Sequence, residues 1–167
     1  HLVVRDCTVR ACGGGGDIYY GLAEGKGMLC SGFSTVTIDG CRFEENGWKC
    51  RTSRNGLASR GTALHVSGAL VELTRTRFVG NKARTGNADA SIVELAGSCG
   101  GSVVKNCLFA GNLVDCGVSS SGKCGALCIN FAETNEVVAV VNCTFADNRL
   151  KGTFLNFNGK SPSLNAV

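Results

Sequence analysis

The stretch Cys107–Asn112, CLFAGN, has three near-copies elsewhere in the chain. CRFEEN begins at Cys41, TRFVGN at Thr76 and CTFADN at Cys143. The phenylalanines of the four copies follow one another at intervals of 31 to 36 residues. A period in this range is typical of proteins that stack one structural unit on the next, so the sequence predicts a repeat architecture. The repeated pairs are Phe43 and Asn46, Phe78 and Asn81, Phe109 and Asn112, and Phe145 and Asn148.

The neighbours of each phenylalanine keep the same register. A partial fifth copy, CTVRAC, begins at Cys7 and has Val9 in place of the phenylalanine. The position five residues before the phenylalanine is always apolar: Val4, Ile38, Leu73, Val104 and Val140. The position two residues before it is cysteine in all copies but one: Cys7, Cys41, Thr76, Cys107 and Cys143. Several columns of equivalent residues therefore run through the repeat.

A second block recurs between the copies of the first. It reads GMLCSG from Gly27, TALHVSG from Thr62, SIVELAG from Ser91, GALCINF from Gly125 and TFLNFNG from Thr153. Two apolar residues flank one other residue in each copy, and this alternation predicts a strand with one buried face. The inward pairs are Met28 and Cys30, Leu64 and Val66, Val93 and Leu95, Leu127 and Ile129, and Leu155 and Phe157. The expected outward column is Leu29, His65, Glu94, Cys128 and Asn156.

Each period is thus expected to contain three short strands separated by sharp corners and one variable loop. The 24 glycines and single proline fit many corners between hydrogen-bonded strands, because proline cannot donate to a ladder. Apolar residues do not recur at intervals of three and four residues, as they would on one face of a helix, so helices are excluded. The predicted fold is all-β, a right-handed, single-stranded parallel β-helix of about five coils. It forms one domain over residues 1–167.

The paired motifs resemble the polymorphic outer-membrane protein repeat, which combines an F-x-x-N corner with a G-G-A-L strand on a pectate-lyase-like superfold. The F-x-x-N half is intact in all four copies. The other half is closest in CGAL, Cys124–Leu127, and then in GTAL, Gly61–Leu64. The resemblance implies a cell-surface, adhesive or structural role.

The repeated positions have structural roles in this interpretation. Each phenylalanine should stack on the phenylalanine of the next coil, and each asparagine should turn the chain. Asparagine tolerates left-handed backbone angles, and stacked asparagine side chains should form a hydrogen-bonded ladder. The cysteine column should hold mostly buried thiols, since parallel Cβ vectors suit disulfides poorly; strained disulfides are the alternative.

Eleven cysteines favour a secreted, oxidised compartment. Cys116 and Cys124 flank one loop, and Cys12 and Cys50 are expected at one corner of neighbouring coils, so both pairs are candidate disulfides. NCT at Asn142 is a candidate N-glycosylation site. No signal peptide precedes His1, so we expect a processed or excised piece of a longer product.

The sequence predicts no enzyme, cofactor or metal site. His65 and Cys128 should lie two coils apart, which is too far for a Cys–His pair or shared zinc ligation, and a surface His65–Glu94 contact is expected instead. The alternative is a polysaccharide lyase or hydrolase, which uses clustered aspartates or an Arg/Lys base on one outer sheet, and no acidic cluster lines up across the coils. The outward positions read Thr8, Arg42, Arg77, Leu108 and Thr144.

Residues 49–84 carry a charge of +7, whereas the whole chain carries +4. We expect a loop over residues 47–60 to project beside a single basic corner. The candidate binding patch is Trp48, Arg51, Arg54, Arg75, Arg77, Lys82 and Arg84. A solvated basic face is one interpretation, and binding of an acidic glycan, lipid head group or acidic cell-surface partner is the other. Nucleic acid does not fit a disulfide-permissive compartment.

Neither end of the chain resembles a helical cap, and the glycine-rich run Gly13–Gly27 is expected to be a flexible excursion. The sequence shows no apolar run long enough to span a membrane. The expected partners are flanking β-helix coils or further copies of the chain in a filament. The predicted function is that of a non-catalytic, extracellular or cell-surface structural module. Carbohydrate or acidic-partner binding is the alternative.

Overall fold

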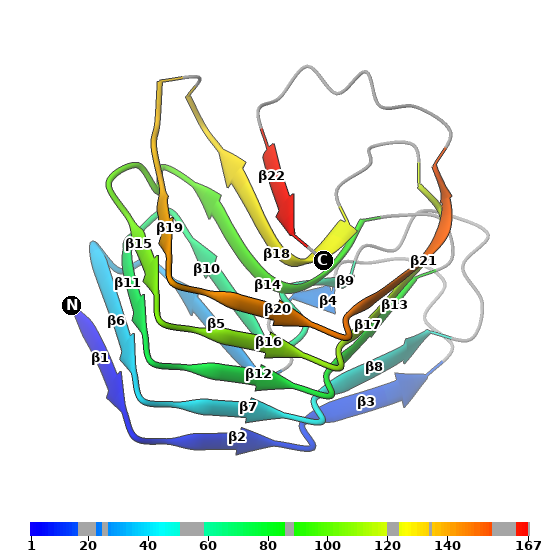
Figure 1. Cartoon of the computed structure of the whole chain (residues 1–167). Coiled ribbons are helices and arrows are strands. Elements are labelled where there is room, and N and C mark those ends of the chain that lie inside the picture. The colour runs from blue at the N-terminus through cyan, green and yellow to red at the C-terminus, as the bar shows by residue number, and fades with distance from the viewer. Residues whose placement is uncertain are drawn as a thin grey trace.

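A computed structural model shows a parallel β-solenoid, drawn in Figure 1. It describes residues 1–16, 23–24, 27–50, 59–85, 89–119, 124–133, 135–154 and 163–166, and this part of the chain contains no helix. The strands stack in parallel with residues about one repeat apart in register, for example Val4 beside Ile38. The β-helix expected from the sequence is therefore confirmed.

The solenoid has four sides, each a separate sheet. Sheet A contains β1 (Leu2–Arg5), β6 (Thr35–Asp39), β11 (Leu70–Thr74), β15 (Val103–Lys105) and β19 (Ala139–Val141). Sheet B contains β2 (Thr8–Arg10), β7 (Arg42–Glu44), β12 (Arg77–Val79), β16 (Leu108–Ala110) and β20 (Thr144–Ala146). Sheet C contains β3 (Gly13–Gly16), β8 (Gly47–Cys50), β13 (Lys82–Arg84), β17 (Leu113–Ser119) and β21 (Arg149–Phe154).

Sheet D contains β5 (Met28–Ser31), β10 (Leu64–Ser67), β14 (Ala90–Gly97), β18 (Cys124–Phe131) and β22 (Ser163–Ala166). Two short strands, β4 (Ala23–Glu24) and β9 (Ser59–Arg60), pair with each other, and β9 also pairs with β14. Sheets A, B and C are each five strands deep. The count of complete coils is slightly lower than expected, because the last layer is not closed by a fourth parallel strand.

Sheet C corrects the expected three strands per coil. Its strands follow directly after the asparagine corner, where the sequence analysis placed loops. The glycine run therefore begins with β3, and the segment after Asn46 begins with β8, which pairs with β3. The inward positions described in this sheet include Ala83 and Val114, which are 1% and 3% exposed. Three-residue strands like Lys82–Arg84 are too short to show a clear period of two.

The phenylalanine stack forms the centre of the core. Phe43, Phe78 and Phe109 are fully buried, and successive ring centroids are 5.0, 5.0 and 4.6 Å apart, ending at Phe145. The interplanar angles are 15°, 14° and 5°, so the rings are stacked. Val9 pairs with Phe43 in register at the other end of the stack. The roles expected for these residues are confirmed.

The asparagine ladder is also confirmed. The backbone N–H and the Nδ2 of Asn46 both donate to Oδ1 of Asn81, at 3.0 Å each. Asn81 donates to Asn112 in the same way, and Asn112 donates to Asn148. The Nδ2 of each asparagine also donates to the carbonyl at the phenylalanine position of the preceding coil, as from Asn81 to Phe43 at 2.9 Å. One buried side chain therefore joins each coil to its neighbours.

The left-handed backbone position lies one residue before the asparagine, contrary to expectation. These residues are Ala11, Glu45, Gly80, Gly111 and Asp147, with φ between 52° and 65°. A second left-handed position precedes the cysteine column: Asp6, Gly40, Arg75, Asn106 and Asn142, with φ between 49° and 65°. Each repeat therefore makes its two corners around sheet B with one left-handed residue apiece. The asparagine itself supplies the hydrogen bonds.

The cysteine column consists of free thiols. The Cys107 thiol donates to the Lys105 carbonyl at 3.3 Å and to the Leu73 carbonyl of the preceding coil at 3.5 Å. Cys41 and Cys143 repeat this pattern. The hydroxyl of Thr76 fits the same column, because it donates to the carbonyl two residues earlier at 2.8 Å. The expectation of buried thiols is confirmed for Cys41 and Cys107, whereas Cys7 is exposed.

Native-state alkylation should distinguish the thiols of this column. We expect iodoacetamide to modify Cys7 readily and to leave Cys107 unmodified, because burial raises the pKa of the Cys107 thiol to about 12 and the thiolate is the reactive form. Peptide mass spectrometry measures each site separately. The same treatment in urea is the control and should modify both cysteines. Rapid native modification of Cys107 would contradict its position in the core.

The last coil is covered along one side. β22 pairs antiparallel with β18, with Cys128 opposite Asn165, and it occupies the edge where a fifth parallel strand was expected. Figure 1 shows β22 in red beside β18. Thr153 and Phe154 belong to β21 in sheet C, and the expected inward pair Leu155 and Phe157 lies outside the described residues. Neither end of the sequence resembles a helical cap, but a strand covers the sheet D edge at this end.

Candidate functional site

The column His65, Glu94 and Cys128 lies in register on three neighbouring strands of sheet D, as expected. It is not exposed, however: the three residues are 4%, 2% and 1% accessible. Part of the cover is the turn at Gly61, where an added Cβ would lie 2.7 Å from the Cα of His65. The expected surface His–Glu contact is therefore a buried contact, with 3.9 Å between His65 Nδ1 and Glu94 Oε2.

The Glu94 carboxylate is the centre of a buried polar cluster. Its Oε1 accepts a hydrogen bond from Nδ2 of Asn130 at 2.6 Å, and its Oε2 accepts one from the Ser91 hydroxyl at 3.1 Å. Ser91 in turn accepts from the Gly61 N–H at 2.8 Å, which attaches the covering turn to the cluster. Arg60 forms an ion pair with Asp89 at 3.2 Å beside it. The cluster therefore fastens a loop to sheet D.

The register of sheet D keeps His65 and Cys128 from forming a Cys–His pair. Glu94 lies between His65 and Cys128, and the two strand spacings that separate these residues prevent the histidine from activating the thiol. No group of three or more potential metal ligands occurs among the described residues. His65 Nδ1 is buried and has no hydrogen-bond partner among the described residues. We interpret the cluster as structural.

Replacing Glu94 by glutamine should change how stability depends on pH. Burial raises the pKa of Glu94, and the charges of His65 and Arg60 act against this shift. A carboxyl group whose pKa is higher in the folded state stabilises the fold below its ordinary value of 4.5, and this contribution is lost as the pH rises through the folded-state pKa. The free energy of unfolding of the wild type should therefore fall, relative to Glu94→Gln, as the pH rises above 4.5.

Urea unfolding of both proteins across this pH range measures the difference. The other titratable groups of the cluster, Arg60, His65, Asp89 and Cys128, are present in both proteins, so their contributions largely cancel. Glu133→Gln, at an exposed position, is the control and should show no such trend. A difference between wild type and Glu94→Gln that stays constant with pH would contradict the prediction.

The basic patch is divided between two corners instead of one. Arg75 and Arg77 lie where sheet A meets sheet B, whereas Lys82 and Arg84 lie on β13 in sheet C. The separation follows from the strand between them, because Phe78 points inward and the chain turns again at Gly80. Arg51 and Arg54 lie outside the described residues, as does the side chain of Trp48. The part of the chain described here contains no single basic corner.

Two of the four described cations in the patch are paired with carboxylates. Arg75 binds Asp39 of the preceding coil through two hydrogen bonds, which hold the pKa of Asp39 well below its usual range. Arg84 Nε lies 3.3 Å from Asp115 Oδ2 of the following coil. Arg77 and Lys82 are exposed and make no ion pair among the described residues.

Arg42 belongs with the unpaired cations, although the candidate patch did not include it. It is exposed on β7, directly beside Arg77 on β12, and it makes no ion pair within the described residues. The signal was present in the sequence, because Arg42 and Arg77 occupy consecutive places in the outward column of the third strand.

The candidate disulfide between Cys12 and Cys50 is wrong. The Cys12 thiol is free, and its backbone N–H donates to Oδ1 of Asn46, so Cys12 occupies the asparagine column. Cys50 instead pairs in register with Gly16, at the far end of β3. With a rise of about 3.3 Å per residue, this places the two Cα atoms beyond the roughly 7 Å limit for a disulfide.

The other modifications remain predictions. The side chains of Cys116 and Cys124 lie outside the described residues. Cys116 lies at a bulge in β17, where the pairing with β21 changes register between Asp115 and Gly117. Asn142 is exposed at a left-handed corner with φ of 51°. Its side chain is therefore accessible for glycosylation.

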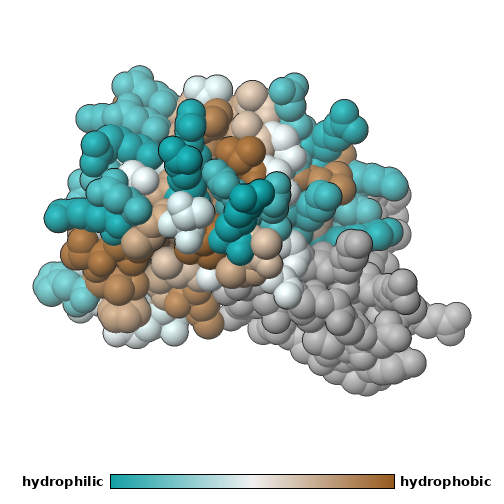
Figure 2. All heavy atoms as spheres, turned by 90° about the horizontal axis from the view of Figure 1, so that it is seen from below, coloured by the Kyte–Doolittle hydropathy of each residue, from teal (hydrophilic) through white to brown (hydrophobic). Residues whose placement is uncertain are grey.

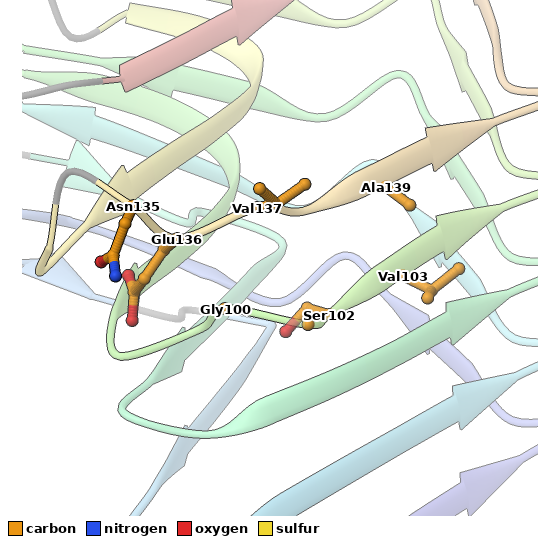
Figure 3. A pocket seen from close by; sticks show the side chains of 8 residues that line it. Gly100, Ser102, Val103, Asn135, Glu136, Val137 and Ala139 are labelled. Carbon is orange, nitrogen blue, oxygen red and sulfur yellow. The ribbon is translucent and has the colours of Figure 1, made fainter.

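A hollow open to solvent lies near the connection between sheets D and A. Figure 3 shows Asn135 and Glu136 at one end of it, with Val103, Val137 and Ala139 further along. Glu136 lies against Gly100, and its Oε2 accepts the Ala132 N–H at 3.1 Å. The lining is mostly small and apolar, so the hollow does not bring together groups for catalysis.

No protein-family model, curated protein or solved structure matches this chain. No helix in the described part of the chain is long and apolar enough to cross a membrane.

Proposed function

We propose that the chain is a non-catalytic structural or adhesive module of an extracellular or cell-surface protein. The observation that supports this most is the asparagine ladder. In every full repeat the most regular polar side chain is committed to joining one coil to the next, and Asn46, Asn81 and Asn112 are fully buried. A site that binds or transforms a substrate needs polar groups that face solvent, and the repeat provides none at these positions.

The repeat type that we propose is that of the polymorphic outer-membrane proteins. Both halves of the motif have a physical reason in this fold. The F-x-x-N half supplies the stacked ring and the ladder. The G-G-A-L half places a small residue inside the tight corner before β10 and within β18, where Ala63 and Ala126 are 0% and 1% exposed. A larger side chain at these places would not fit between neighbouring coils.

Assembly is proposed through the sheet edges that stay open. β22 covers β18. Among the described strands, β19, β20 and β21 each pair on one side only, as do β1, β2, β3 and β5 at the opposite end. Unpaired edges are templates for further strands. The partners are therefore flanking coils or further copies of the chain.

Three measurements test this proposal. Antibodies against the chain should label intact, unpermeabilised source cells. Incubation with acidic polysaccharides, with and without calcium, should release no products, and measurable turnover would overturn the non-catalytic assignment. Electron microscopy and sedimentation of the purified chain should reveal end-to-end filaments if copies pair through these edges, whereas discrete monomers would leave flanking coils as the partners.

A further inference from the structure

The outer face of sheet B carries a pair of like charges in direct register. Arg42 on β7 and Arg77 on β12 are Cα partners, and both side chains are exposed. Adjacent strands lie about 4.8 Å apart, and like charges opposite each other destabilise a sheet. Neither arginine has a carboxylate partner among the described residues. The pair therefore presents an uncompensated positive charge in a fixed geometry.

The neighbouring cations form ion pairs with carboxylates. Arg42 and Arg77 differ from them in this respect. Arg10, on the same face, binds the Glu45 carboxylate at 3.0 Å, and Arg75 at the edge binds Asp39. Glu44 also lies on this face, but it is the Cα partner of Arg10 on one side and of Val79 on the other. The unpaired positive charge on this sheet is thus concentrated on Arg42 and Arg77.

The outward positions of this face carry no charge towards the later coils. Leu108 and Thr144 continue the row of the two arginines, and Val79, Ala110 and Ala146 form the next row. Figure 2 views the molecule from below, towards the first coil and sheet B, and shows hydrophilic residues beside apolar and neutral ones. The outward positions of sheet B include no aromatic side chain on which a nucleic-acid base could stack.

We propose that this face binds a linear polysaccharide that carries sulfate or carboxylate groups, with Arg42 and Arg77 as the anchoring residues. Guanidinium groups bind both anions through paired hydrogen bonds. The strand spacing that separates the two arginines is comparable to the length of one sugar unit in an extended chain, so successive anionic groups meet successive arginines. The small apolar residues beside them offer a surface for the C–H faces of the sugar rings. This inference rests on the proposed extracellular role. It names the class of ligand that an adhesive module of this kind would bind.

Binding to immobilised dextran sulfate and to polygalacturonate tests the inference, and the two polymers separate sulfate from carboxylate recognition. We expect binding that weakens with added salt, and about a tenfold weaker affinity for Arg42→Gln/Arg77→Gln. The matched control is Lys105→Gln/Arg149→Gln, which removes the same charge from exposed positions on sheets A and C and should stay within about twofold of wild type. Circular dichroism should show that both variants are folded.

Several results would overturn the inference. These are equal loss of affinity in the two double variants, equal binding of uncharged dextran, tighter binding of oligothymidylate, or no binding of either acidic polymer. The last result would leave the structural role intact, because surface labelling and the absence of turnover are measured separately. Loss of surface labelling, in contrast, would contradict the proposed extracellular location whether or not the polysaccharide binds.

Discussion

Asn81→Ala is expected to lower the free energy of unfolding by about 3–5 kcal/mol. Asn81 is fully buried, and its side chain accepts from the backbone N–H of Asn46 and donates to the carbonyl of Phe43. Alanine would leave this donor and this acceptor buried without partners, and each unsatisfied group costs about 1–3 kcal/mol. Urea unfolding followed by circular dichroism measures the change.

Two further variants sharpen this result. Asn135→Ala, at an exposed asparagine, should change stability by less than about 0.5 kcal/mol. Asn81→Asp keeps the shape and the acceptor but cannot donate to Phe43 while ionised, so it should be destabilising at neutral pH and less so in acid. A loss below about 1 kcal/mol for Asn81→Ala would show that the ladder does not hold the coils together.

Phe78→Ala is expected to cost about 3–5 kcal/mol, because it removes a fully buried ring from the middle of the stack. Phe78 has one ring on each side, both with centroids 5.0 Å away. Phe145 is only partly buried and has one stacked neighbour, so Phe145→Ala should cost less. Thermal and urea unfolding of the two variants provide the comparison.

A double-mutant cycle isolates the contact between neighbouring rings. Phe78→Leu, Phe109→Leu and the double variant should give a coupling energy of about 0.5–1.5 kcal/mol. Equal destabilisation by Phe78→Ala and Phe145→Ala would contradict the end effect expected of a stack. A coupling energy of zero would assign the whole loss to burial.

The regular columns could be predicted because every copy reports the same position. The columns of Phe43 and Asn46 each occur in four copies in the sequence, and several positions seldom agree in register by chance. The fourth strand could not be predicted in this way. Its inward position holds residues as different as Ala83 and Val114, and its strands have as few as three residues.

The candidate sites were harder to predict for a different reason. The outward column of sheet D is partly covered by the turn at Gly61, directly before β10, and no periodicity shows that this turn packs against His65. In the basic patch, Arg75 and Arg84 form ion pairs with carboxylates on neighbouring coils. Such ion pairs depend on which residues meet between neighbouring coils. The ion pair of Arg84 lies in sheet C, a sheet that was not predicted from the sequence.

The asparagine ladder gives the column a direction. From Asn46 to Asn112 each amide accepts at its oxygen from the earlier coil and donates from its nitrogen to the asparagine oxygen of the later coil. Dipoles aligned head to tail polarise one another, so each added coil strengthens the bonds of those already in place. The two ends of the solenoid are consequently unequal electrically. Whole coils can be inserted between existing ones without disturbing the alignment, and a coil entering in the reverse sense would break it.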